Sequence, residues 1–274
     1  MSPQDSTVRY EVVDGIATIT LDRPASLNAM NDDLMIDLHR ALDRVVADES
    51  VRVAVLTGAG RGFCSGADLS NASNENVEPV TDAARGDAVA AGMDDTFHPP
   101  IRLLSNLPVP TIARVNGVAA GGGFGLALGC DVVIAARSAR FVCTFGPRLG
   151  IVPDLGTTFH LAHRVGIARA RGIAMLGDPI SAEQAVEWGL IWTVVDDDNL
   201  DAEVSAVAGR LARSSPDAMT RIRECFEVAE TNSFSAQLDV ERDHQRALIP
   251  RNMAEGAAAF MEKREPHFDS LRRR

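Results

Sequence analysis

The sequence lacks the cysteine and histidine patterns of disulfide-stabilised and metal-binding proteins. Its 274 residues include only four cysteines, Cys64, Cys130, Cys143 and Cys225, with neither zinc-ligand spacing nor the pattern of a disulfide framework. None of the six histidines lies in an HExxH motif. We therefore expect reduced cysteines and no metal site.

Positive charge and long apolar runs are also scarce. Lys and Arg number 27 against 38 Asp and Glu, which gives a net charge of −11 and a pI near 5.0. Nucleic-acid binding requires basic surfaces, so we expect no nucleic-acid partner. No uninterrupted apolar run reaches membrane-spanning length, and the opening MSPQDSTVRY has neither the basic start nor the apolar centre of a signal peptide. The expectation is a cytoplasmic protein with no membrane partner.

The sequence is otherwise that of an ordinary globular chain, with 46% hydrophobic and 24% charged residues. Its length suits one large domain, or one domain and an appendage. Asp14-Gly15 between two β-branched runs predicts a hairpin, and the alternation of strands and helices after it predicts an α/β core. We expect strands at 8–13, 16–21, 53–56, 111–115, 131–135, 141–145 and 191–195. Helices are expected at 32–47 (capped by Asn31), 101–106, 124 onward, 157–165, 168–176, 182–188 (capped by Ser181 and ended by Gly189), 202–212, 216–229, 233–247 and 253–263.

Two glycine-rich stretches each follow a predicted strand. The first is GAGRGFCSGADL at 58–69, and the second is NGVAAGGGFGLALGCD at 116–131. Glycines let backbone amides approach a ligand closely, although such runs are also common in tight turns. Two N–H donors that converge from separate loops form an oxyanion hole. The polar, acidic segment 71–98 between them predicts a loop with partial helix, either a lid or a surface excursion.

These motifs, taken in order, resemble the crotonase, or enoyl-CoA hydratase/isomerase, superfamily. The matching segments are LDRPASLNAM, GRGFCSGADL, NGVAAGGG with its following Asp131, IVPDLGTT and LGDPISAEQAVEWGLIWTVV. The resemblance implies an α/β fold that spirals through ββα units with mixed sheets. Residues 1–200 would form this core with its acyl-CoA site, and 201–274 would form a helical region for oligomerisation and pocket closure. Self-association as a trimer or a dimer of trimers is implied.

The resemblance also implies the chemistry, which is stabilisation of a thioester enolate on an acyl-CoA substrate without a metal or redox cofactor. The two oxyanion donors correspond to the backbone amides of Ala67 and Gly122. Coenzyme A binding is expected at Arg23, Ala25, Leu27, Ala67, Asp68, Leu69 and Lys263, the last from the C-terminal helix of the same or a neighbouring subunit. Arg23 could equally be a surface charge, and Asp68 could mainly anchor its loop.

Hydratases of the superfamily use two glutamates, which correspond here to Gly125 and to about Phe145. The segment FVCTFGPRLG is one residue longer than the usual pattern, but no Asp or Glu lies between Arg137 and Val152. Asp154 remains, and it resembles the aspartate of dienoyl-CoA isomerases and of the ring-epoxide isomerases of phenylacetate degradation. We therefore predict an isomerase with Asp154 as its acid/base. Asp154 could instead cap the helix that begins near 156 or 157.

Two alternatives stay open beside the isomerase. One is a hydratase that takes its acid from Glu75, Glu78, Asp82 or Asp87, and the other is a catalytically silent acyl-CoA-binding protein. Several further residues are expected to be structural. Asp131 is interpreted as a hydrogen-bond partner, Cys64 and Cys143 as packed thiols, and His98, His160 and His163 as surface or satisfied interior histidines.

Overall fold

In the computed structural model, residues 6–71 and 81–268 are described. They form two sheets. The larger has the strand order β1-β2-β3-β5-β7-β10 and is parallel except for the β1–β2 hairpin. The smaller has the order β4-β6-β8-β9, with β9 antiparallel to β8. The strands are β1 Val8–Val13, β2 Ile16–Leu21, β3 Val53–Gly58, β4 Gly62–Cys64, β5 Thr111–Val115, β6 Val118–Ala120, β7 Val132–Ala136, β8 Arg140–Val142, β9 Ile180–Ser181 and β10 Thr193–Val195.

From β3 to β8, consecutive strands alternate between the two sheets. The pairs β3–β4, β5–β6 and β7–β8 each contribute one strand to each sheet and are followed by helices, so the chain spirals through ββα units. The longer helices are α1 Asp32–Ala47, α2 Asp82–Gly92, α3 His98–Ser105, α4 Gly122–Leu128, α5 Thr157–Leu176, α6 Ala182–Glu187, α7 Leu200–Arg213, α8 Pro216–Ala229 and α9 Phe234–Glu262. Short helical turns cover Pro24–Ser26, Leu69–Asn71, Met93–Phe97, Phe145–Leu149 and Asp197–Asn199.

Local signals account for the elements at the start of the chain. Asp14 and Gly15 both have positive φ, at 50° and 77°, as the tight turn of a two-residue hairpin requires. The Asn31 side chain accepts a hydrogen bond from Leu34 N at 3.1 Å and so caps α1. The predicted hairpin and the first predicted helix are therefore confirmed at the predicted residues.

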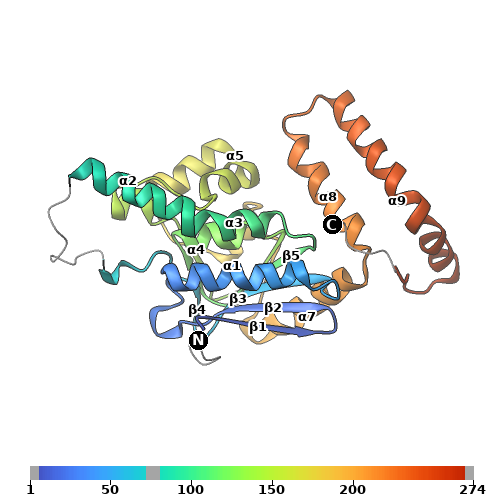
Figure 1. The fold of residues 1–274 in the computed structure, drawn as a ribbon, viewed down its shortest axis with the longest axis horizontal. Coiled ribbons are helices and arrows are strands. Elements are labelled where there is room, and N and C mark those ends of the chain that lie inside the picture. The colour runs from blue at the N-terminus through green and yellow to red at the C-terminus, as the bar shows by residue number, and fades with distance from the viewer. Residues whose placement is uncertain (1–5, 72–80, 269–274) are drawn as a thin grey trace.

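Helix α4 lies in the middle of the molecule, between the sheets and the outer helices (Figure 1). All seven of its residues are buried, and it contacts β4, β5, β6 and α5. It begins at Gly122, two residues before the predicted start at Phe124. The second glycine-rich stretch therefore delivers its backbone into the interior of the protein.

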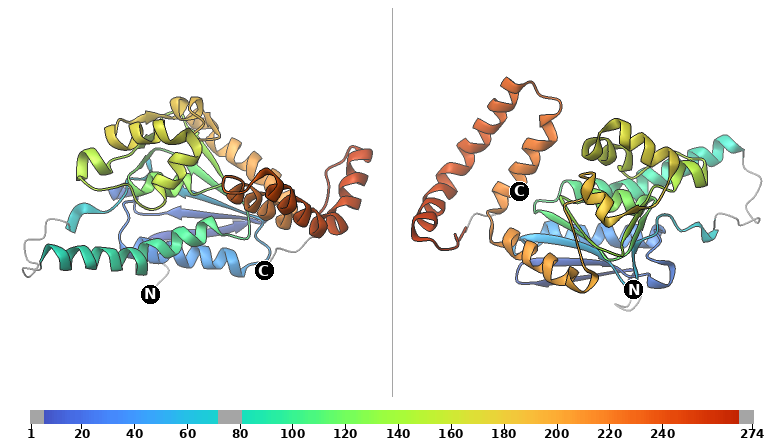
Figure 2. Two further views of the ribbon diagram at one scale, coloured as in Figure 1. Left: turned by 90° about the horizontal axis from the view of Figure 1, so that it is seen from above. Right: turned by 180° about the vertical axis from the view of Figure 1, so that it is seen from behind.

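Helix α7 packs against the larger sheet, whereas α8 and α9 form a hairpin that stands away from the body (Figures 1 and 2). The hairpin leaves large apolar side chains exposed. Phe226, Phe234 and Phe260 are 76%, 81% and 83% exposed. The division of the chain at residue 200 stays a prediction. No helix in the described part of the chain is long and apolar enough to cross a membrane.

Two sequence predictions are wrong, and a third is correct only in part. The segment 71–98, predicted as a loop with partial helix, is helical throughout from Asp82, because Thr81 caps α2 and the alanine-rich chain favours a helix although every residue of 81–91 is exposed. Residues 72–80, also in that prediction, lie outside the described residues.

The predicted strand at 141–145 is instead β8, which ends at Val142. The chain then makes a helical turn over Phe145–Leu149, and Pro147 within it has no N–H to donate to a strand. The helices predicted at 233–247 and 253–263 are one helix, α9, which continues through Pro250. In contrast, the break predicted within 157–176 is confirmed, since Gly166 has non-helical φ and ψ of 73° and 157°.

Candidate active site

The two glycine-rich loops lie against each other. A Cβ atom added to Gly66 would be 2.9 Å from Ala120 O and 3.4 Å from Gly121 Cα. Gly66 has a φ of 95° and Gly121 a φ of 52°, both in the left-handed range that glycine tolerates. Ala67 and Gly122 directly follow these two glycines. They therefore lie on two loops that contact each other.

The direction of the Ala67 amide follows from its neighbours. Gly66 O accepts from Met30 N at 2.7 Å, and Asp68 N donates to Met30 O at 2.8 Å. Successive amides of an extended chain point to opposite sides, so the Ala67 N–H points away from Met30. It has no hydrogen-bond acceptor among residues 6–71 and 81–268.

Gly122 is the first residue of α4, and the amides of the first helical turn have no acceptor within their own helix. Both amides therefore remain available to a ligand. Their assignment as oxyanion donors stays a prediction, which this geometry supports.

Asp154 lies in the turn that leads into α5. Burial raises the pKa of its carboxyl, while a hydrogen bond from its own backbone and the charge of His98 lower it, and the net pKa is raised. The N-cap residue of α5 is Gly156, and no described side chain caps this helix. The alternative that the Asp154 carboxylate serves as the helix cap is therefore wrong.

His98 agrees with its prediction as a surface or satisfied histidine, and in its protonated form it also lowers the pKa of Asp154. It is the first residue of α3, its side chain is 30% exposed, and its Nδ1 lies 3.1 Å from Asp94 Oδ1. The i, i+4 spacing of Asp94 and His98 could have revealed this pair. The pair was not predicted because the partial helix expected in 71–98 had no predicted bounds.

The two cysteines near the loops are packed thiols. Cys64 is fully buried, and desolvation raises its pKa to about 12. Burial likewise raises the pKa of Cys143 to about 11. Neither thiol forms a thiolate near neutral pH, so the structure supports packing over nucleophilic attack.

Asp68 anchors the loop that carries Ala67. Its carboxylate accepts from Ser70 N at 3.1 Å and pairs with Arg23 Nη2 at 2.8 Å, and these bonds lower its pKa to about 2. Arg23 also donates to Ala29 O. Arg23 and Asp68 therefore join the loop after β2 to the loop after β4.

The other residues predicted to bind coenzyme A are divided between two places. Ala25 and Leu27 lie in and directly after the Pro24–Ser26 turn near Arg23, and Leu69 follows Asp68. Lys263 follows α9 in the hairpin that stands away from the body (Figure 1). A role for Lys263 beside the Arg23 loop therefore requires the hairpin of another subunit, and all of these assignments stay predictions.

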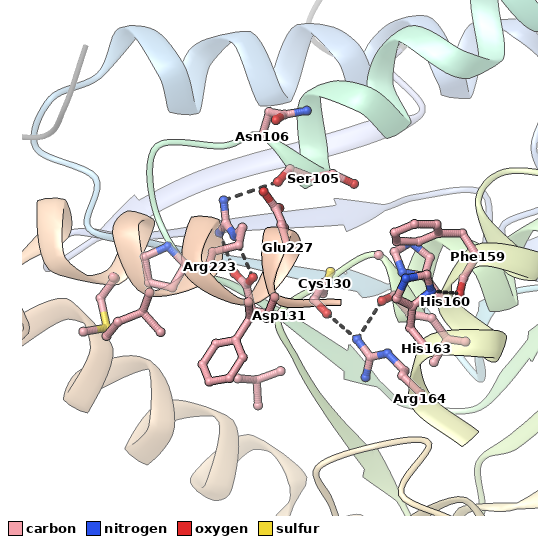
Figure 3. A pocket seen from close by; sticks show the side chains of 18 of the residues that line it. Ser105, Asn106, Cys130, Asp131, Phe159, His160, His163, Arg164, Arg223 and Glu227 are labelled. Carbon is pink, nitrogen blue, oxygen red and sulfur yellow. Dashed lines mark hydrogen bonds and ion pairs between the residues drawn. The ribbon is translucent and has the colours of Figure 1, made fainter. Parts of the chain in front are cut away.

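A separate cavity of about 880 Å³ lies between α8, α5 and the turn from α4 to β7 (Figure 3). None of the predicted catalytic or coenzyme A-binding residues lines it. His160 on its wall is mostly buried, and burial lowers its pKa to about 4. Arg164 donates to Leu128 O at the end of α4, to Cys130 O in the turn after it and to Leu190 O after α6.

Asp131 is confirmed as a structural partner. It accepts from the backbone N–H of Thr111 at 2.7 Å and pairs with Arg223 of α8 through both carboxylate oxygens, at 2.7 and 2.6 Å. Arg223 donates further to Leu107 O and Val109 O. This guanidinium therefore fixes the middle of α8, the first helix of the C-terminal hairpin, to the core (Figure 3).

Replacing Arg223 with methionine should lower the free energy of unfolding by about 2 kcal/mol or more, since Asp131 and two carbonyls lose a partly buried partner. The thermal midpoint should fall by about 4–8 °C. Arg242 on α9 is the matched control, because it pairs with Asp239 and Asp243 while 59% exposed, and Arg242→Met should shift the midpoint little. Equal shifts for the two variants would contradict the anchoring role of Arg223.

Comparison with known proteins gives concordant matches. The family model described as enoyl-CoA hydratase/isomerase matches residues 11–271. The chain is 46% identical to a 1,2-epoxyphenylacetyl-CoA isomerase of Escherichia coli (strain K12), over 93% of this chain and 95% of that protein. It is 41% identical to a "Probable enoyl-CoA hydratase" of Rhodobacter capsulatus, over 96% and 97% of the two chains.

A solved structure from Thermobifida fusca YX, of an enoyl-CoA hydratase-like protein in complex with CoA, superimposes with a TM-score of 0.78 at 33% identity. The match covers 89% of this chain and 93% of that chain. The crotonase-like fold expected from the sequence is confirmed.

Proposed function

Because the chain belongs to the enoyl-CoA hydratase/isomerase family, we propose that it is an acyl-CoA isomerase that moves a double bond or rearranges a ring through a thioester enolate. The observation that carries this proposal is Asp154. Its carboxyl is half-buried and has a raised pKa, as a general base requires, and it precedes a turn packed on α4.

The proposed chemistry needs one carboxylate and two amides. Asp154 takes a proton from the carbon next to the thioester carbonyl, and the carbonyl oxygen gains the negative charge. The Ala67 and Gly122 amides donate to this oxygen. Asp154 then returns the proton to a different carbon, so that the double bond moves and no atom is gained or lost. No metal or redox cofactor is required.

Hydration is the second candidate, favoured by relatives such as the one from Rhodobacter capsulatus. It would need a further acid. Of the candidates in 71–98, Glu75 and Glu78 lie outside the described residues, and Asp82 and Asp87 lie on the exposed helix α2. We therefore favour the isomerase, and the Escherichia coli relative, which is named as an isomerase, supports this choice.

Incubation with 2-enoyl-, 3-enoyl- and dienoyl-CoA tests the proposal. Movement of a double bond without a hydroxyacyl product is expected. Net water addition would exclude the isomerase, and coenzyme A binding without turnover of any substrate would favour the silent alternative.

The pH dependence should report Asp154. A base works in its ionised form, and a raised pKa means that Asp154 becomes protonated at a higher pH than an ordinary carboxyl. When the pH is lowered, the isomerase kcat/KM should therefore begin to fall at a pH above the usual pKa range of a carboxyl group. His98→Gln removes a charge that lowers the pKa of Asp154, so the acid limb should move to still higher pH.

His39, which is also partly exposed and paired with an aspartate, provides the control for this profile. The acid limb of the kcat/KM profile should lie at the same pH in His39→Gln as in the unaltered protein. A limb that does not move in His98→Gln, or that moves to lower pH, would show that His98 does not act on the catalytic carboxyl.

We also propose self-association through the α8–α9 hairpin, in a cytoplasmic trimer or dimer of trimers. Light scattering should give three or six times the chain mass. Replacing the exposed Phe234 and Phe260 with serine should weaken this assembly, because it removes apolar area from contact. Val13→Ser, at a 65% exposed position in the first hairpin, is the control. A monomer at all concentrations would contradict the proposal.

A further inference from the structure

Gly125 of α4 has no room for a side chain. A Cβ atom there would overlap Thr157 Oγ1, lie 2.8 Å from Leu155 O and lie 3.4 Å from Asp154 O. Contacts under 3.0 Å force a neighbour to shift, and here one neighbour is backbone. The turn from Asp154 to Thr157 therefore fills the space beside Gly125.

This turn has an unusual backbone. Leu155 has a φ of 48° and Gly156 a φ of 79°, so two successive residues are left-handed. The conformation is unfavourable for leucine, which persists in it only where the surroundings hold it. The Leu155 side chain is 5% exposed, and its Cδ1 lies 2.7 Å from the position that a Cβ on Gly122 would take. Leucine packing under the first turn of α4 thus holds the turn in place.

Thr157 shows how closely the turn is packed. Its side chain is 0% exposed, and its Oγ1 has no hydrogen-bond partner in the described part of the chain. A buried hydroxyl without a partner is unfavourable and rare. Its backbone N–H is satisfied, because it donates to Asp154 O at 2.9 Å. The hydroxyl is therefore placed by packing against Gly125 and not by a hydrogen bond of its own.

We propose that the Leu155–Thr157 turn is a specificity element that occupies the place where a side chain on residue 125 would stand. It leaves Asp154 as the single carboxylate of the site and so restricts the site to moving a proton. This inference rests on the proposed function. The inference goes beyond the absence of a glutamate at position 125. A carboxylate side chain introduced there alone would have no room, because the turn already occupies the space.

A double-mutant cycle tests the packing. Gly125→Ala should lower the thermal midpoint by about 3–10 °C. Adding Thr157→Ala should recover only part of that loss, because the added Cβ would still lie too close to Leu155 O. Gly172→Ala is the matched control, since Gly172 lies in α5 with nothing within 4 Å of its added Cβ and should not lower the midpoint. A Gly125→Ala variant as stable as the control, or strictly additive effects, would overturn the inference.

Activity tests the specificity. Gly125→Glu should not add water to 2-enoyl-CoA at a rate above that of the unaltered protein. A gain of about tenfold or more would show that the place is open and would overturn the inference. The double-mutant cycle measures thermal midpoints and does not depend on activity. If the unaltered protein isomerised no enoyl-CoA, the proposed function would be refuted. The cycle would still decide whether the turn fills the space beside Gly125.

Discussion

Replacing Asp154 with asparagine is expected to lower kcat for enoyl-CoA isomerisation by about 10²–10⁴-fold, the contribution of a positioned general base. Asparagine has nearly the same shape but cannot ionise. Affinity for the acyl-CoA should change little, because the carboxyl acts on the substrate proton and the thioester is held by backbone amides. Steady-state kinetics with the best enoyl-CoA of the panel would separate kcat from KM.

Stability provides a check on this variant. Burial raises the pKa of Asp154, which means that the fold disfavours its charged form, so a neutral amide should keep or slightly raise the thermal midpoint. Asp178→Asn, at an exposed position before β9, is the control and should keep full activity. An Asp154→Asn enzyme with more than a tenth of the original kcat would show that another group moves the proton.

Replacing Ala67 with proline is expected to lower kcat by about 10²–10³-fold, because it removes one backbone donor of the oxyanion hole. Side-chain substitutions cannot test this donor, but proline has no N–H. Ala67 is exposed and is not among the residues with positive φ, and its N–H has no acceptor among the described residues. The fold should therefore lose no internal hydrogen bond.

Ala67→Gly keeps the N–H and should lose far less activity than Ala67→Pro. Both variants need their thermal midpoints measured, since a large fall in only the proline variant would mean a disturbed loop. A stable Ala67→Pro enzyme with nearly full kcat would refute the assignment of Ala67 as a donor.

The parts of the fold that the sequence predicts well have strong local signals. The Asp14-Gly15 turn defines the first hairpin, and the Asn31 cap with its apolar stripe defines α1. The bounds of α2 could not be predicted within the partial helix expected at 71–98, because its exposed alanines give no apolar period to detect. The gap predicted between 247 and 253 contains Pro250 but is absent from α9, since one lost hydrogen bond does not end a helix of 29 residues.

In the candidate site, too, some features have a local sequence signal and others depend on the packing of distant segments. The glycine patterns locate the loops of Ala67 and Gly122, because the close contact between these two loops leaves no room for a side chain at Gly66. His98 becomes visible only once helix α3 and the Asp154 turn are placed together. The left-handed Leu155 has no local signal, since its conformation depends on the packing of its side chain under Gly122.

Mass spectrometry of the product formed from 3-enoyl-CoA in ¹⁸O-labelled water tests the central claim most directly. An isomerase that works through an enolate and a single carboxylate yields 2-enoyl-CoA, with the mass of the substrate and no label. Accumulation of an ¹⁸O-labelled hydroxyacyl-CoA as the main product would contradict the account.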